Sequence, residues 1–328
     1  MRYYLGVDGG GTKTYALITD EDGRIVGKGV GGNGNHQIDG DTARMSIELA
    51  VEQALQQAEL TREEIAYAYF GLAGADRETD YRILNPMIAS LGLPRFQVNC
   101  DTMIAMRAGT DRPYGVVLIC GTGTNCAGVN EQGEFLQCGG FSYKYGDFGG
   151  GGSLSIEAFR TVIRAWDGRE EQTLLTQLVL DELGYQTTEE MFHDFLDHAK
   201  PVPAELTKLL FNAADQGDTP AQTILRKQGE ELGKAARAVI RQLNMGDSSF
   251  DVVLAGSVVT RGSGNHIDPY VEAYVKEAAP QANLAKLGIE PVAGAVWLAM
   301  EADGAGVSSG ARERLERLVY FAQDGEGV

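Results

Sequence analysis

The chain opens with an apolar strand that leads, through an aspartate and three glycines, into a second strand. Residues 3–7 are apolar, Asp8-Gly9-Gly10-Gly11-Thr12 follows, and a second strand is expected at 15–19. Glycines let backbone N–H groups approach a ligand, and successive N–H groups in such a turn form a concave anion site. An aspartate at a strand end can hold hydrated Mg²⁺, and a threonine hydroxyl can donate to phosphate. The stretch therefore predicts a phosphate-binding hairpin.

Other interpretations of this stretch are weaker. Three glycines by themselves also suit a plain hairpin turn, but the flanking aspartate, threonine and strands disfavour it. A Walker loop is excluded because no Gly-x-x-x-x-Gly-Lys-Ser/Thr sequence occurs. A dinucleotide-binding loop would lead into a helix, whereas this one leads into a strand.

The apolar pattern that follows predicts one α/β domain over residues 1–113. A third strand is expected after the turn at 20–23, and helical spacing of apolar residues predicts an amphipathic helix. Strands and helices then alternate up to Asp101, which stands between a strand and a helix. The expected strands are 24–30, 66–72 and 96–100, and the expected helices are 42–58, 81–91 and 102–108.

A second unit of similar order is expected over residues 114–302. Its first two strands flank the turn Gly121-Thr122-Gly123-Thr124, and a long helix precedes a buried strand that ends in Gly256-Ser257. A final helix at 312–321 is expected to pack back on the first domain, which a segment of about 303–328 would complete. The boundary near Arg112-Pro113 is predicted to be a hinge, because no low-complexity linker separates the units. The expected strands are 115–120, 124–129, 134–138 and 250–255, and the expected helical segments are 153–166, 171–214, 220–243, 269–278 and 294–300.

Charge and cysteine usage narrow the class of partner. A length of 328 residues suits two domains. The net charge of −18 argues against nucleic acid or an anionic membrane surface as the main partner, but ATP remains suitable because local N–H groups and Mg²⁺ can hold a triphosphate. The sequence has no long apolar run that would span a membrane. The four cysteines show no CxxC or zinc spacing, so we expect reduced thiols and a cytoplasmic protein.

Asp101 is the carboxylate that the sequence favours for chemistry. It follows the strand at 96–100, and ligands of open α/β sheets bind at the carboxyl ends of the strands. A carboxylate there can accept the proton of a substrate hydroxyl during phosphoryl transfer. The alternative is a helix N-cap, which is compatible with catalysis.

Polar residues on glycine-rich loops suggest a sugar as the second ligand. Asn35, His36, Asn125 and Asp147 are donors or acceptors of the kind that desolvated sugar hydroxyls need. For His36 a solvated loop position is the favoured alternative. Phe141 suits either stacking on a sugar face or anchoring of its loop.

These motifs resemble the N-acetylglucosamine kinase and BadF/BadG-type ATPase family of the sugar kinase, Hsp70 and actin superfamily. The resemblance covers nearly the whole chain and implies an α/β fold of two ribonuclease-H-like, actin-like ATPase domains around a central cleft. It rests on the stretches Gly6–Thr14, Gly34–His36, Ala73–Arg77, Asp101, Gly121–Cys126, Gly139–Phe141, Gly146-Asp147 and Ala255–Ser257.

The resemblance also implies roles for individual residues. Thr12 and Thr122 would meet the phosphates of ATP, Asp8 would organise Mg²⁺, and Asp101 would be the general base acting on a sugar hydroxyl, by analogy the 6-OH. The nucleotide positions are completed by Gly10, Gly11, Lys13, Gly121, Gly123, Ala214, Gly256 and Ser257. The sugar positions, with Asp101, are Asn35, His36, Thr124, Asn125, Gly140, Phe141, Ser142 and Asp147.

Two departures from the family pattern bear on the substrate. The family's amino-sugar kinases usually have Trp-Gly and Gly-Asp-Glu-Gly-Ser, where this chain has Phe141-Ser142 and Gly146-Asp147-Phe148-Gly149-Gly150. We expect an ATP-dependent kinase of a sugar or amino sugar, with N-acetylglucosamine as the leading candidate and another hexose or amino sugar as an alternative. The small-molecule sugar is the expected partner, and a homodimer is left open.

Two other functions remain as alternatives. An activator ATPase would drive electron transfer from an iron–sulfur cluster shared across a dimer, but Cys100, Cys120 and Cys126 fall at or beside predicted buried strands. A sensor that binds ATP and a sugar without turnover would use the same clamp.

Overall fold

Two five-stranded sheets with the same strand order form the cores of two lobes. The computed structural model describes residues 1–321. The first sheet has the order β3 (Ile25–Gly31), β2 (Thr14–Asp20), β1 (Tyr3–Gly9), β4 (Ile65–Leu72) and β5 (Phe96–Cys100). The central β1 pairs antiparallel with β2 and parallel with β4. The carboxyl ends of β1, β4 and β5 therefore lie at one edge of this sheet.

The second sheet repeats this arrangement. Its order is β8 (Phe135–Gln137), β7 (Thr124–Val129), β6 (Gly115–Cys120), β9 (Asp251–Ala255) and β10 (Asn283–Lys286). Here β6 pairs antiparallel with β7 and parallel with β9, as β1 does with β2 and β4. The similar order expected for the two units is therefore present in the strand topology.

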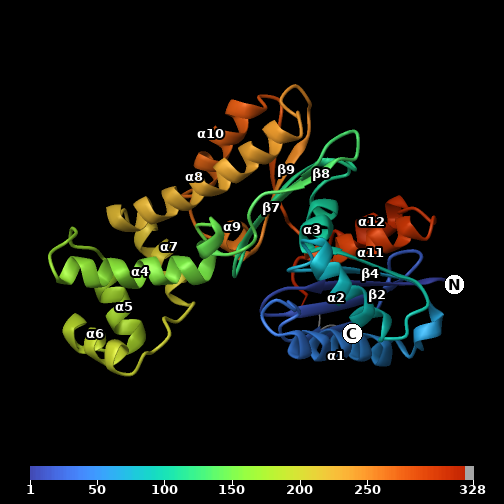
Figure 1. The fold of residues 1–328 in the computed structure, drawn as a ribbon, viewed down its shortest axis with the longest axis horizontal. Helices are drawn as coiled ribbons and strands as arrows, with labels where there is room; N and C mark the ends of the chain where they lie inside the picture. The colour runs from blue at the N-terminus through green and yellow to red at the C-terminus, as the bar shows by residue number, and fades with distance from the viewer. Residues whose placement is uncertain (322–328) are drawn as a thin grey trace.

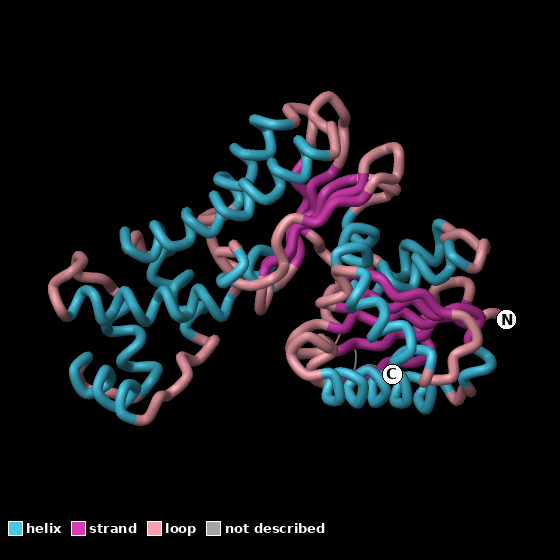
Figure 2. The backbone as a smooth tube through the Cα atoms, in the orientation of Figure 1, coloured by secondary structure: helices cyan, strands magenta, loops and turns pink. Residues whose placement is uncertain are grey.

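Helices cover both sheets and extend the second lobe away from the first (Figures 1 and 2). The first lobe contains α1 (Gly40–Ala58), α2 (Glu78–Ala89) and α3 (Asp101–Gly109). A helical region, α4 to α7, projects from the second sheet at the left of Figure 1. The remaining bounds are α4 (Gly151–Trp166), α5 (Leu175–Leu183), α6 (Thr188–Asp197), α7 (Leu206–Asp215), α8 (Thr219–Gln242), α9 (Ser257–Arg261), α10 (Asp268–Ala278), α11 (Pro291–Ala302) and α12 (Ser309–Leu315), with 3-10 turns at Arg62–Glu64 and Tyr143–Tyr145. Within the described residues, no helix has the length and apolar character needed to cross a membrane.

Glycines at alternate positions of β3 bring helix α1 into direct contact with the strand. A Cβ on Gly27, Gly29 or Gly31 would overlap a backbone carbonyl oxygen of α1. The carbonyls belong to Ala54, Ala50 and Ser46, which are four residues apart. Two strand residues span about 6.6 Å and four helical residues about 6 Å, so the two periods match along the contact. The glycines are thus required by packing.

The chain returns to the first lobe after β10. Helix α11 buries Val292, Val296 and Trp297 in one cluster with Tyr4 and Leu17 of the first sheet. A Cβ on Gly6 would lie 2.7 Å from the Val296 nitrogen, so the helix rests directly on β1. The helix expected at 294–300 was assigned to the second domain, and that division of the chain stays a prediction.

A buried carboxylate anchors the end of α11. Asp303 accepts hydrogen bonds from Arg2 and from the Tyr4 hydroxyl, each at 3.1 Å, and pairs with Arg95. Its side chain is only 6% exposed. The start of the chain and the start of β5 are thereby tied to the returning helix.

Two expectations about the last third of the chain are wrong. Strand β10 was missed because only four residues, Asn283–Lys286, pair with β9, and their mixed polarity resembles a loop. The final helix starts earlier than the predicted 312–321, at Ser309, because the Ser308 hydroxyl accepts from the Ala311 N–H and caps it. It ends at Leu315, and it does pack on the first lobe through Ala311 and Leu315. The expected segment beyond residue 321 lies outside the described residues.

Replacing Gly29 with Ala should destabilise the first lobe. The added Cβ meets the Ala50 carbonyl of α1, which is backbone and can move only with the whole helix. We expect a loss of about 1–3 kcal/mol, the usual cost of overpacking. Thermal unfolding of Gly29→Ala should be compared with that of Gly40→Ala, where no atom lies within 4 Å of the new Cβ. Equal melting temperatures for the two variants would contradict this account of the contact.

Candidate functional site

The hairpin between β1 and β2 has the compact backbone that its glycines predict. The Gly10 N–H donates to the Lys13 carbonyl at 2.9 Å, and the Gly10 carbonyl accepts from the Gly34 N–H at 2.9 Å. Thr12 and Lys13 are exposed at the tip. The turn therefore presents its threonine outward from a rigid base.

The corresponding turn of the second lobe meets this hairpin. Between β6 and β7, the Gly121 N–H donates to the Gly123 carbonyl at 2.9 Å, and the Gly121 carbonyl accepts from the Gly151 N–H at 2.7 Å. The hydroxyl oxygens of Thr12 and Thr122 lie 3.1 Å apart. Two turns separated by 110 residues in the chain thus face one another across the lobe junction.

A third small-residue turn follows β9 and packs against the end of β6. Gly256 has a φ of 90°, and a Cβ there would lie 2.5 Å from the Cys120 carbonyl carbon. Gly256, Ser257 and Asp8 line one pocket of about 300 Å³, which also contains Arg261, Glu290 and Tyr320. Ala214, in contrast, is buried in the core of the second lobe on α7 and does not line this pocket.

Two carboxylates at strand ends carry strongly shifted proton affinities. Burial raises the pKa of Asp8 to about 8, and the negative charges of Asp101 and Glu290 add to the rise. Burial also raises the pKa of Asp101 to about 6, opposed by a hydrogen bond from Cys100 and reinforced by the charge of Asp76. Asp101 is the first residue of α3 and directly follows β5. Burial makes ionisation of both carboxyl groups unfavourable, so a nearby cation or hydrogen-bond donors would stabilise their ionised forms.

The site suits a cation held jointly with phosphate. Among the described residues, no group of three or more His, Cys, Asp and Glu side chains could hold a metal by itself. Mg²⁺ usually keeps several waters and binds one or two carboxylates together with substrate phosphates. Asp8, whose ionised form a cation would stabilise, shares a pocket with the Gly256 turn and fits that mode of binding.

Asp147 organises the loop in which three of the predicted sugar contacts lie. Its carboxylate accepts backbone N–H groups from Gly140, Phe141 and Ser142 at 3.2, 2.7 and 2.7 Å. Ser142 has a φ of 95°, a conformation that L-residues rarely adopt, and the Asp147 contacts hold it there. Phe141 is 37% exposed at the loop surface.

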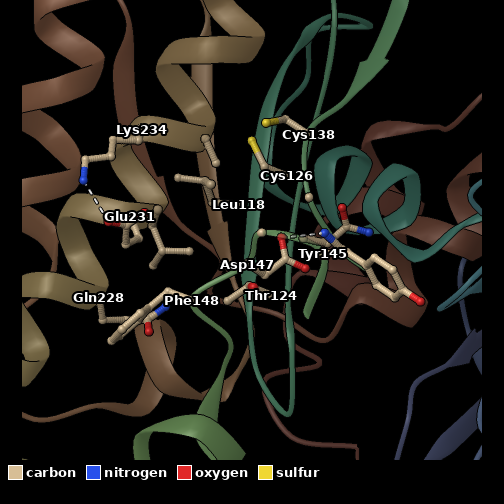
Figure 3. A pocket seen from close by; sticks show the side chains of 16 residues that line it. Leu118, Thr124, Cys126, Cys138, Tyr145, Asp147, Phe148, Gln228, Glu231 and Lys234 are labelled. Atoms are coloured by element: carbon tan, nitrogen blue, oxygen red, sulfur yellow. Dashed lines mark hydrogen bonds and ion pairs between the residues drawn. The ribbon is translucent and has the colours of Figure 1, made fainter. Parts of the chain in front are cut away.

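This loop forms one wall of a second cavity of about 300 Å³ (Figure 3). Thr124, Asn125, Gly140 and Asp147 line the cavity, so four of the predicted sugar positions share it. Figure 3 shows Gln228, Glu231 and Lys234 of α8 on the opposite wall. Leu118, Leu232 and Phe148 make part of its surface apolar.

His36 is not a solvated loop residue, as sequence analysis had favoured. Its side chain is 4% exposed and its Nε2 lies 3.3 Å from Asp80. Burial would raise the pKa of Asp80, but hydrogen bonds from Arg77 and Gln37 lower it to about 2. The preceding Asn35 accepts from the Gln37 N–H at 2.9 Å through its side-chain oxygen. Both residues belong to a polar network beside the loop that follows β4.

Asp76, which received no role from the sequence, lies close to Asp101. The thiol of Cys100 is 3.4 Å from Asp76 Oδ1 and 3.3 Å from Asp101 Oδ1. A usable signal was present, because Asp8, Asp76 and Asp101 each stand at or shortly after the carboxyl end of a parallel strand. Gln137 of β8, also unassigned, donates to Asp76 at 2.9 Å from the other lobe.

Replacing Asp8 with Asn should stabilise the nucleotide-free protein and change its pH dependence. The folded pKa of about 8 lies far above that of an ordinary aspartate, about 3.9, so between these two pH values the folded protein binds the proton more tightly than the unfolded chain does. The contribution of the Asp8 carboxyl group to the free energy of unfolding is therefore fully present below about pH 4 and is lost as the pH rises toward 8. We expect Asp8→Asn to gain about 0.5–2 kcal/mol at pH 8, measured by thermal unfolding from pH 5 to 8. The exposed Asp197→Asn is the control, and an unchanged pH slope in Asp8→Asn would refute the assigned cause.

Comparison with known proteins places the chain in a family. The sequence profile of the BadF/BadG/BcrA/BcrD ATPase family matches residues 5–299. The N-acetylmuramic acid/N-acetylglucosamine kinase of Clostridium acetobutylicum is 32% identical over 265 residues, covering 79% of this chain and 86% of the relative. The N-acetyl-D-glucosamine kinase of Dictyostelium discoideum is 26% identical over 312 residues, covering 90% and 97%.

The fold agrees with this placement. A solved structure of a candidate N-acetylglucosamine kinase from Chromobacterium violaceum has a TM-score of 0.66 at 23% identity and covers 91% of this chain and 99% of that one. The likeness confirms the expected α/β, actin-like ATPase fold, and an ATPase family implies the use of ATP. The chain belongs to the BadF/BadG/BcrA/BcrD ATPase family.

Proposed function

We propose that the chain is an ATP-dependent kinase of amino sugars, with N-acetylglucosamine as the leading substrate and the 6-OH as the acceptor by analogy. The observation that carries the proposal is the 3.1 Å approach of Thr12 to Thr122 at a junction that also contains Asp8 and Asp101. Two curated relatives that align over most of this chain are named as kinases of N-acetylated amino sugars. Both lines of support point to phosphoryl transfer in the cleft.

Each residue has a defined task in this proposal. The backbone N–H groups of the two threonine turns bind the phosphates of ATP, and the Gly256 turn lies against the nucleoside. When bound at Asp8, Mg²⁺ would neutralise phosphate charge. Asp101 accepts the proton of the sugar hydroxyl while the hydroxyl oxygen bonds to the γ-phosphorus and the bond from that phosphorus to ADP breaks. With a pKa of about 6, Asp101 is mostly ionised at neutral pH and can act as a base.

The cysteines favour the kinase over an electron-transfer activator. An iron–sulfur cluster shared across a dimer needs cysteines presented together at a surface. Cys100, Cys120 and Cys126 are buried, and burial raises the pKa of each thiol. Cluster ligands must be thiolates, so these environments oppose ligation.

A panel of sugars tests the proposed activity. ADP release should be measured with glucose, glucosamine, N-acetylglucosamine, N-acetylmuramic acid and N-acetylmannosamine, and the phosphate position then determined on the product. We expect the highest kcat/KM with an N-acetylated amino sugar. Sugar binding that depends on nucleotide, without ADP release, would instead support the sensor alternative.

Replacing Asp101 with Asn should remove the base while preserving the cleft. The amide has nearly the same size but cannot accept the hydroxyl proton, so we expect kcat to fall by about two to four orders of magnitude. Nucleotide affinity should stay close to that of the wild type and also serves as the control for folding. Turnover at a near-normal rate would remove Asp101 from the mechanism.

The pH dependence of the wild-type enzyme provides an independent check on the base. Burial raises the pKa of Asp101 to about 6, and only the ionised form accepts a proton. We therefore expect kcat/KM to fall tenfold per pH unit below about pH 6. An acid limb centred near pH 4, the range of an ordinary aspartate, would contradict the assignment.

A further inference from the structure

Three buried oxygen atoms at the lobe junction have no hydrogen-bond donor within the described structure. They are Asp76 Oδ2, Asn125 Oδ1 and Gln137 Oε1. Asp76 belongs to the loop after β4 in the first lobe, whereas Asn125 lies on β7 and Gln137 on β8 in the second. The three residues adjoin each other. Gln137 donates to Asp76 Oδ1 at 2.9 Å, and the Asn125 amide is near enough to Asp76 to oppose the rise in its pKa that burial causes.

The orientation of the amides follows from their partners. The Gln137 amide nitrogen donates to Asp76 Oδ1 and, at 3.1 Å, to the Gly139 carbonyl. The Asn125 amide nitrogen lies 3.7 Å from the Cys100 sulfur. With both nitrogens directed at acceptors, the unpaired atoms of all three residues are acceptors. Buried polar atoms are nearly always paired, so three unpaired acceptors in one place mark a site that lacks its donors.

The position of these acceptors relates them to the proposed sugar site. Cys100 bridges Asp76 and Asp101 through its sulfur, at 3.4 and 3.3 Å. Asn125 also lines the cavity that it shares with Thr124 and Asp147. Asp76 and Asp101 both lie within 3.4 Å of the Cys100 sulfur, so one small ligand can reach both carboxylates.

We propose that Asp76, with the side-chain oxygens of Asn125 and Gln137, forms a subsite that binds hydroxyl donors of the sugar and makes Asp76 a specificity-determining residue. The inference rests on the proposed function and deepens it by naming the chemistry of the accepted group. A hydroxyl supplies the donor that the subsite lacks, whereas an ether or a carboxylate at the same carbon supplies only acceptors beside a carboxylate. Because its members come from both lobes, the subsite is complete only when the lobes are together.

Monodeoxy sugars test the subsite directly. For the sugar selected by the ADP-release panel, kcat/KM should be measured for the parent and for its 3-deoxy and 4-deoxy forms, with the wild type and with Asp76→Asn. We expect one deoxy form to lose about 10- to 100-fold with the wild type, because it leaves the acceptors unpaired. With Asp76→Asn, kcat/KM for the parent sugar should fall by most of the same factor. The ratio of kcat/KM between the parent and the sensitive deoxy sugar should then shrink to within about threefold, whereas the ratio for the other deoxy sugar should stay as in the wild type.

Two variants separate recognition from structure. Asp20→Asn changes a buried carboxylate of the same lobe, at the opposite end of the sheet, that already accepts the N–H groups of Asp22 and Arg24, so it should lower the melting temperature and leave both deoxy ratios unchanged. Gln137→Met removes the amide that the second lobe contributes and serves as the test if Asp76→Asn folds poorly. It should reduce the same deoxy penalty. Unchanged deoxy ratios in both Asp76→Asn and Gln137→Met would overturn the subsite.

The outcomes also separate this inference from the proposed function. If the wild type releases no ADP, the same parent and deoxy sugars can be titrated calorimetrically with a non-hydrolysable ATP analogue present. A deoxy penalty in affinity that disappears in Asp76→Asn would then support the subsite while the kinase proposal fails. If the wild type turns over and Asp76→Asn leaves the deoxy penalties unchanged, the subsite is refuted and the kinase proposal stands.

Discussion

Three desolvated carboxyl groups at the junction of the two lobes are the constraint on which the site depends. Asp8, Asp76 and Asp101 are all desolvated, and each has a raised pKa. Burying carboxylates near one another costs free energy unless positive charge or donors compensate. Phosphate-bound Mg²⁺ at Asp8 and hydroxyl donors at the other two carboxylates would supply that compensation. In the proposed function, these carboxyl groups would favour ligand binding at the expense of the stability of the fold.

The repeated sheet topology explains how these groups come together. In each sheet the central strand, β1 or β6, ends in a glycine turn and pairs parallel with the strand that follows the first helical crossover, β4 or β9. The two edges that carry the turns face each other, which brings Thr12 and Thr122 within 3.1 Å. In the proposed function, the two similar edges would bind phosphate from both sides, and the loops that differ between the lobes would hold the sugar.

Packing between helices and glycine-rich strands makes these edges rigid. The α1 backbone rests on Gly27, Gly29 and Gly31, and α11 rests on Gly6 of β1. Since Asp8 is two residues beyond Gly6, the helix that returns from the second lobe supports the strand that carries this carboxylate. The same helix ends at Asp303, where Arg2, Tyr4 and Arg95 fix it to the first lobe. Helix α11 therefore connects the second lobe to the strand that carries Asp8.

The sequence by itself determined the order of nearly all strands and helices, because apolar periodicity and glycine turns are local properties of the chain. It also determined the two threonine turns and Asp101, since each directly follows a strand. Only the tertiary structure decided that β10 pairs with β9, that His36 is buried against Asp80, and that Asp76 meets Gln137 across the lobes. Those outcomes depend on contacts between segments far apart in the chain, and neither residue type nor local spacing encodes such contacts.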